Sequence, residues 1–144
     1  MKTFRATLPL ALSLAALSLA PAAGTAQTDP VERRIVQEVD ARADEGISLL
    51  ERVVNVNSGT MNLAGVREVG RILRAQFDAL GFETRWIDGT PFQRAGHLVA
   101  RHPGTGTRVL LIGHLDTVFE PDSPFQRFVR DGDRAAGPGV VDMK

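Results

Sequence analysis

The sequence has 144 residues, and its 17 Lys and Arg balance its 17 Asp and Glu, so the formal net charge is zero. A neutral chain lacks the surplus of positive charge that neutralises phosphates, and we expect no nucleic-acid partner. A hydrophobic content of 43% and a charged content of 24% are typical of a globular domain and argue against disorder. Cysteine is absent, which excludes disulfides, thiolate metal sites and cysteine nucleophiles.

The first 26 residues have the layout of a secretory signal peptide. Lys2 and Arg5 precede an apolar run over residues 8–20, and small residues follow up to Ala26. The apolar run is shorter than the stretch of about 20 residues that a membrane-spanning helix needs. We therefore predict a signal peptide over residues 1–26, a periplasmic or secreted location, and no membrane attachment after cleavage.

A long amphipathic helix is predicted at the start of the mature chain. Asp29 is placed as its N-cap and Pro30 as its first helical residue. Gly46 weakens the middle of this helix, and we expect any break there. The apolar positions recur every three or four residues and predict a buried stripe. They are Val36, Val39, Ala43, Ile47, Leu50 and Val54.

A turn over residues 57–60 separates this helix from a second one, predicted over residues 63–80. Asn62 is its candidate N-cap, and Gly81 is the expected C-terminal stop. Its apolar residues again follow helical spacing and predict a buried face. They are Val66, Val69, Leu73, Phe77 and Leu80.

The second half of the chain reads as strands and turns. Strands are predicted over residues 82–87, 97–101 and 108–113, and a hairpin over residues 128–136. The continuous apolar run at residues 109–112 is typical of a central strand covered on both faces. Helices followed by strands predict an α/β or α+β fold, with a mixed sheet and helices on its faces.

His114 and Asp116 follow the apolar run and are the first candidate site residues. Two positions apart, they point to the same side if the strand continues. A neutral imidazole is a good zinc ligand, and a nearby carboxylate can hold its second nitrogen. An isolated His-x-Asp pair is more commonly structural, and that alternative stays open at this point.

Asp142 is the third candidate. It follows the glycine turn at residues 137–139 and a short apolar segment, which together fix its position. One carboxylate can bridge two metal ions about 3.5–4 Å apart in two-metal hydrolases. Taken alone, Asp142 could equally be an exposed loop aspartate.

The segments GHLDTV at 113–118 and GPGVVDMK at 137–144, in this order, resemble the zinc-dependent aminoacylase and glutamate carboxypeptidase family of metallopeptidases. The segments ISLLERVVNVNSGT, ILRAQFDALGFET and FVRDGDRAAGPG are similar to its two N-terminal helices and a hairpin. The resemblance implies a phosphorylase/hydrolase-like α/β fold that holds two zinc ions. It implies that His114 is a zinc ligand, Asp116 the catalytic aspartate that supports the site's histidine, and Asp142 the carboxylate that bridges both zincs.

The resemblance further implies an exported zinc hydrolase that cleaves a C-terminal peptide bond or an N-acyl amino-acid amide with metal-activated water. Small peptides or N-acyl amino acids would be its substrates, and the full-length form would be a homodimer. In this family the general-base glutamate and the later ligands follow the bridging aspartate. We therefore expect residues 27–144 to be a truncated N-terminal part of the catalytic domain, inactive alone. Glu120 lies soon after the His-x-Asp motif, but on a proline-containing loop, and we expect it to be a loop acid that does not replace the general base. The alternative for the whole chain is a catalytically inactive fragment or a binding module.

Overall fold

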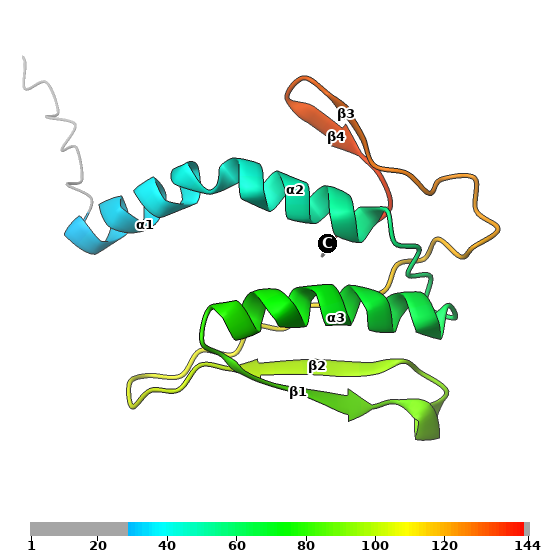
Figure 1. Ribbon diagram of the computed structural model, residues 1–144, viewed down its shortest axis with the longest axis horizontal. Helices are drawn as coiled ribbons and strands as arrows, with labels where there is room; N and C mark the ends of the chain where they lie inside the picture. The colour runs from blue at the N-terminus through cyan, green and yellow to red at the C-terminus, as the bar shows by residue number, and fades with distance from the viewer. Residues whose placement is uncertain (1–28, 143–144) are drawn as a thin grey trace, which may run out of the picture.

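Residues 29–142 are described by the computed structural model, so the predicted signal peptide lies outside the described residues. Three helices come first, followed by an antiparallel hairpin, a long loop and a second, shorter hairpin (Figure 1). This is a small mixed α/β arrangement, which confirms the predicted combination of helices and strands. The predicted mixed sheet is not formed among residues 29–142, whose strands make two separate antiparallel pairs. Within the described residues, no helix is long and apolar enough to cross a membrane.

The first predicted helix is divided in two. α1 spans Pro30–Ala41 and α2 spans Ala43–Val54. The break falls at Arg42, whose φ of −110° and ψ of 8° leave regular helical geometry. The prediction of a break at Gly46 was wrong, because this glycine lies inside α2 in an open position where even a Cβ would meet nothing within 4 Å.

α1 starts as predicted but is not covered. The Asp29 carboxylate accepts from the backbone N–H of Val31, and Glu32 completes the capping box. No residue of α1 is buried. The prediction of one buried stripe along the whole first helix is therefore wrong in α1 and confirmed at the end of α2. The exposed fractions in α1 are 64% for Val31, 57% for Ile35, 55% for Val36 and 63% for Val39.

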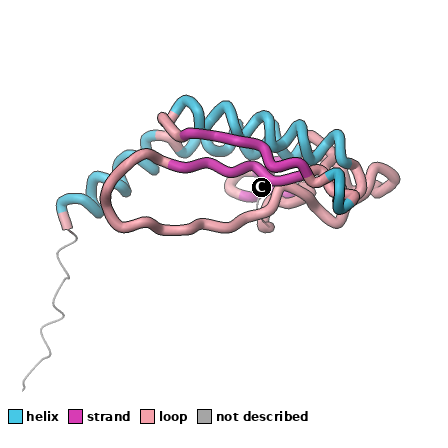
Figure 2. The backbone as a smooth tube through the Cα atoms, turned by 90° about the horizontal axis from the view of Figure 1, so that it is seen from below, coloured by secondary structure: helices cyan, strands magenta, loops and turns pink. Residues whose placement is uncertain are grey.

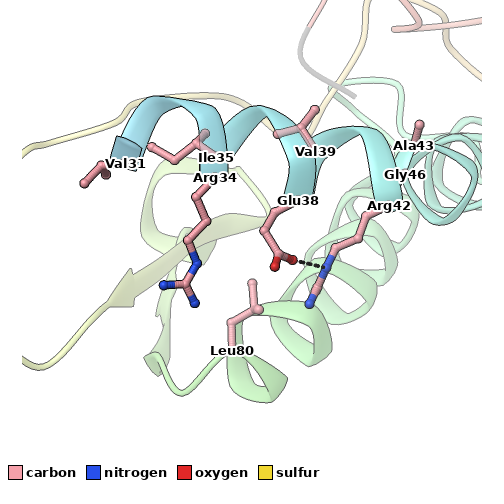
Figure 3. Close-up of a pocket in the computed structure, with 9 residues that line it drawn as sticks. All are labelled: Val31, Arg34, Ile35, Glu38, Val39, Arg42, Ala43, Gly46 and Leu80. Atoms are coloured by element: carbon pink, nitrogen blue, oxygen red, sulfur yellow. Dashed lines mark ion pairs between the residues drawn. The ribbon is translucent and has the colours of Figure 1, made fainter. Parts of the chain in front are cut away.

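α3 spans Leu63–Ala79 and follows its prediction closely. The Asn62 side chain accepts from the backbone N–H of Gly65, as an N-cap does. Gly81 has a φ of +81°, the left-handed conformation that ends helices. Leu80 is the exception in the predicted buried stripe, because it is 58% exposed beyond the helix end. Figure 3 shows it below α1, with the side chains of Arg34 and Glu38 reaching toward it.

The core lies between α2 and α3, and α3 also covers the first hairpin (Figure 1). Val53 of α2 packs with Val69 and Ile72 of α3, and all three are at most 2% exposed. Partly buried apolar side chains surround them. These are Leu49, Val56, Leu73 and Leu115. The core therefore reaches the loop that carries the candidate site through Leu115.

The first hairpin matches its predicted strands. β1 spans Glu83–Asp88 and pairs antiparallel with β2, Gly96–Arg101; a 3₁₀ turn at Thr90–Phe92 connects them. Trp86 of β1 lies over Gly70 of α3, where a Cβ would come within 2.5 Å of the indole. This glycine therefore allows the helix to approach the sheet.

The predicted central strand over residues 108–113 is not formed. The side chains of Val109, Leu110, Leu111 and Ile112 are 79–88% exposed, and no backbone hydrogen bond pairs this segment with another described residue. In Figure 2 the segment is part of an open loop that leaves the end of β2 and turns back. The physical reason is the lack of a partner, since an apolar run becomes a strand only where another strand and a covering layer lie beside it.

The second hairpin is formed as predicted. β3 spans Val129–Asp131 and β4 spans Arg134–Ala136, paired antiparallel. Gly132 in the connecting turn has a φ of +55°, which a glycine adopts without strain. The chain then continues through a buried glycine turn to Asp142, which brings this residue back toward the loop that carries His114.

Candidate functional site

The structure brings the three predicted site residues together. Nε2 of His114 lies 3.3 Å from Oδ1 of Asp142, which is 28 positions away in the chain. Nδ1 of His114 lies 3.0 Å from the backbone oxygen of Asp116 and 3.3 Å from its Oδ1. The imidazole is thus held between two carboxylates, one on each ring nitrogen.

The site is open to solvent, and its exposure is uneven. The side chains of His114, Asp116 and Asp142 are 45%, 34% and 76% exposed, respectively. The hydrogen bond that His114 donates to Asp142 raises the pKa of His114 above its ordinary value, against a smaller opposing effect of desolvation. The backbone oxygen of Asp116 and the charges of both carboxylates add to the increase. The arrangement therefore favours a cation at or beside the imidazole.

The loop between α2 and α3 is hydrogen-bonded to the segment that carries Asp116. Gly59 and Thr117 form an isolated parallel bridge. The backbone N–H of Thr117 donates to the oxygen of Ser58 at 2.8 Å, and the N–H of Thr60 donates to the oxygen of Thr117 at 3.0 Å. The Thr60 hydroxyl then donates to Oδ2 of Asp116 at 2.6 Å. The bridge thus places a hydroxyl group directly on the carboxylate that supports His114.

A second set of hydrogen bonds fixes the same loop. The amide of Asn57 donates to the backbone oxygen of Phe119 and to Oε1 of Gln126, at 3.0 and 2.7 Å. Its oxygen accepts from the Asn62 amide at 2.8 Å. The Gln126 amide donates in turn to the backbone oxygens of Glu120 and Ser123. These bonds tie the loop that follows α2 to the segment after Asp116.

Glu120 is the loop acid that the sequence predicts. Its Oε1 accepts from the backbone N–H of Met61 at 3.0 Å. A Cβ on Gly59 would lie 2.7 Å from the Cα of Glu120, so the two loops approach too closely for any side chain there. Glu120 therefore holds its own loop against the loop that contains Gly59 and Met61.

Sequence reasoning missed Thr60, Asn57 and Gln126. Thr60 is 56 positions from Asp116, and Asn57 is 69 positions from Gln126. No local spacing links residues so far apart. The one available signal is composition, because residues 57–62 read Asn-Ser-Gly-Thr-Met-Asn, a turn rich in side chains that bond to loops.

The described residues supply part of a metal site. No group of three or more His, Asp or Glu side chains in residues 29–142 is arranged to hold a metal ion. His114 and Asp142 provide one nitrogen and one oxygen donor that face each other. The other two histidines lie elsewhere, with His97 on β2 and His102 packed edge-on against Phe82. The surface hollow shown in Figure 3 contains none of the predicted site residues.

Comparison with known proteins adds one relative. The chain is 30% identical over 135 residues to Carboxypeptidase G2 from Pseudomonas sp. (strain RS-16), which covers 90% of this chain and 32% of the relative. The similarity supports a carboxypeptidase-family relationship. The chain spans about a third of the length of this relative. No family model matches the chain, and no solved structure matches it.

Proposed function

We propose that the polypeptide carrying this chain is an exported zinc hydrolase that removes a C-terminal amino acid from small peptides or cleaves N-acyl amino acids. The observation that carries this proposal is the pairing of His114 with Asp142 at 3.3 Å while Asp116 holds the opposite ring nitrogen. The similarity to a carboxypeptidase supports the same type of hydrolase.

The donor chemistry fits zinc. An imidazole nitrogen and a carboxylate oxygen are both common zinc ligands. Nδ1 of His114 contacts Asp116. Zinc-binding histidines commonly have such a hydrogen-bond partner on the ring nitrogen that does not bind the metal. Asp142, with its exposed carboxylate, has a second oxygen available for a second ion. His114 and Asp142 are therefore the residues that would hold metal, and Asp116 would orient the histidine.

When bound, zinc supplies Lewis acidity and makes water a nucleophile near neutral pH. The chain's own residues contribute orientation and charge. The backbone oxygen and Oδ1 of Asp116 both accept on the Nδ1 side of His114. Asp116 therefore keeps a proton on Nδ1, and Nε2 is the nitrogen that would bind a metal ion. The negative charges of Asp116 and Asp142 favour cations at the site and disfavour anions.

We further propose that residues 27–144 form the N-terminal part of a di-zinc catalytic domain of the phosphorylase/hydrolase-like type. The general-base glutamate and the remaining ligands would come from another part of the polypeptide, and the whole protein would be a homodimer. The exposed apolar run at 109–112 supports this proposal. Its composition is that of a central strand, and further strands would give it partners. The leader-like composition of residues 1–26 supports export.

The second candidate is a protein without catalytic activity. It is favoured by the small number of ligands, since the described residues hold no cluster of three. Two donors on a solvent-exposed loop bind zinc weakly compared with the three or four of established sites. Calorimetric titration of residues 27–144 with zinc tests this candidate, and tight binding of two ions per chain would contradict it.

The decisive experiment measures hydrolysis of N-acyl amino acids and of peptides by the whole polypeptide that carries this chain. His114→Ala should reduce activity by more than about 100-fold, because loss of a ligand exceeds the usual effect of losing an outer partner. A chelator should abolish activity, and added zinc should restore it. His97→Ala is the matched control, since His97 is exposed on β2. Unchanged hydrolysis after His114→Ala and metal removal would refute the proposal.

A further inference from the structure

Thr60 makes a close contact with the candidate site that neither the sequence motifs nor the comparison assigns. Its hydroxyl lies 2.6 Å from Oδ2 of Asp116, the length of a charge-assisted hydrogen bond between a hydroxyl and a carboxylate. The other oxygen of Asp116, Oδ1, lies 3.3 Å from Nδ1 of His114. The two oxygens of one carboxylate thus have separate partners, with Thr60 on one and His114 on the other.

The position of this hydroxyl is set by the backbone on both sides. The N–H of Thr60 donates to the oxygen of Thr117, and the N–H of Thr117 donates to the oxygen of Ser58. These bonds flank Gly59, whose close approach to Glu120 leaves no room for a side chain. The Thr60 side chain therefore reaches Asp116 from a fixed backbone, so the hydroxyl can fix the orientation of the carboxylate.

We propose that Thr60 is a positioning residue of the metal site. By donating to Oδ2, its hydroxyl holds the Asp116 carboxylate in the orientation that turns Oδ1 toward Nδ1 of His114. That contact keeps a proton on Nδ1 and turns Nε2 toward Asp142, where a bound metal ion would take the place of the Nε2 proton. This inference rests on the proposed function, since it assigns Thr60 a part in that same site.

A merely structural role for Thr60 gives different expectations. The hydroxyl also lies 3.3 Å from the backbone oxygen of Thr117, so it could act only as one more link between the two loops. Thr60→Val removes the hydroxyl and keeps the shape and both backbone hydrogen bonds. Thr60→Ser returns the hydroxyl without the methyl group. If only the link matters, Thr60→Val changes stability and leaves metal affinity unchanged.

The matched control is Thr90. Its hydroxyl donates to Oδ1 of Asp88 at 2.8 Å, which is the same type of contact in a place away from the site residues. Thr90→Val therefore removes a threonine–aspartate hydrogen bond without touching Asp116. Comparing Thr60→Val with Thr90→Val separates the general effect of losing such a bond from an effect on the site.

The test uses the whole polypeptide that carries this chain and two readouts besides activity. Calorimetric titration measures the zinc dissociation constant of the wild type and the three variants. Nitrogen NMR of metal-free protein with labelled histidine, recorded above the pKa of His114, reports which ring nitrogen carries the remaining proton. We expect Thr60→Val to weaken zinc binding by about 10-fold or more, within the range for outer partners of zinc-binding histidines. We expect the same variant to shift the proton away from Nδ1, while Thr60→Ser and Thr90→Val behave as wild type.

Urea unfolding of the metal-free variants accompanies both readouts, so that lost affinity is not confused with lost folding. A wild type that binds zinc, with Thr60→Val binding it equally well, overturns the role of Thr60 and leaves the proposed function intact. A wild type that binds no zinc overturns the proposed function. In that case the NMR comparison alone tests the positioning role of Thr60. An unchanged His114 tautomer in Thr60→Val overturns that role as well.

Discussion

His114 shows how a single side chain acquires its properties from one neighbour in the sequence and one residue 28 positions away. Its Nε2 faces the carboxylate of Asp142, and its Nδ1 faces Asp116. Both partners are acidic, so each stabilises the protonated imidazole. A metal-free chain therefore holds a proton where the metal-bound form would hold an ion.

The pH dependence of His114 is the first prediction. Because the hydrogen bond to Asp142 raises its pKa above the ordinary value of 6.5, the protonated form is favoured in the folded chain. The resulting stability is fully present below pH 6.5 and is lost as the pH rises through the raised pKa. In metal-free protein, NMR titration should show His114 titrating above 6.5, and Asp142→Asn should lower that pKa.

His97 is the internal control for this titration, since its signals should be the same in both proteins. If the pKa of His114 does not move when the charge of Asp142 is removed, the two side chains are apart in solution. The geometry that carries the proposed function would then be wrong.

The residues of the site were predictable to different degrees. His114, Asp116 and Asp142 stand in short, ordered segments, and these segments point to them without any knowledge of the fold. Thr60 and Asn57 have no such signal, because their roles depend on a bridge between loops about sixty positions apart. Hydrogen bonds between distant loops follow from tertiary packing, which local spacing does not encode.

The same contrast holds at the scale of elements. The caps at Asp29, Asn62 and Gly81 predicted where helices begin and end, since capping depends on residues that are neighbours in sequence. The apolar run at 109–112 predicted a covered strand and is exposed. A strand needs hydrogen-bonding partners from elsewhere in the molecule. The apolar run by itself therefore indicates that these side chains favour burial, and it does not show that a partner strand is present.

A matched pair of substitutions tests the exposure of that run. Ile72 is 2% exposed in the core, and Ile112 is 82% exposed in the open loop. Ile72→Ala should lower the free energy of unfolding by about 2–5 kcal/mol, as core truncations do. Ile112→Ala should change it by less than about 0.5 kcal/mol, as surface changes do. Urea unfolding of both variants measures the difference, and an equal cost at the two positions would show that residues 109–112 are covered in solution.

At the scale of the whole molecule, the described residues leave two apolar surfaces without cover. One is the face of α1 formed by Val31, Ile35 and Val39, and the other is the run at 109–112. The core formed by Val53, Val69 and Ile72 is small beside them. Apolar burial is the main favourable term in folding, so a chain that leaves these surfaces in water forgoes much of its potential stability.

We therefore expect residues 27–144 alone to be less stable than a typical domain, with a free energy of unfolding below about 5 kcal/mol. Urea unfolding at two widely separated protein concentrations measures the free energy of unfolding and shows whether association between copies of the chain contributes to it. An isolated chain unfolds with the same midpoint at both concentrations. A midpoint that rises with concentration would show that copies of the chain cover one another's apolar surfaces, since association adds stability by mass action. A high stability independent of concentration would contradict the exposure of both surfaces, because the chain would then have to bury them against itself.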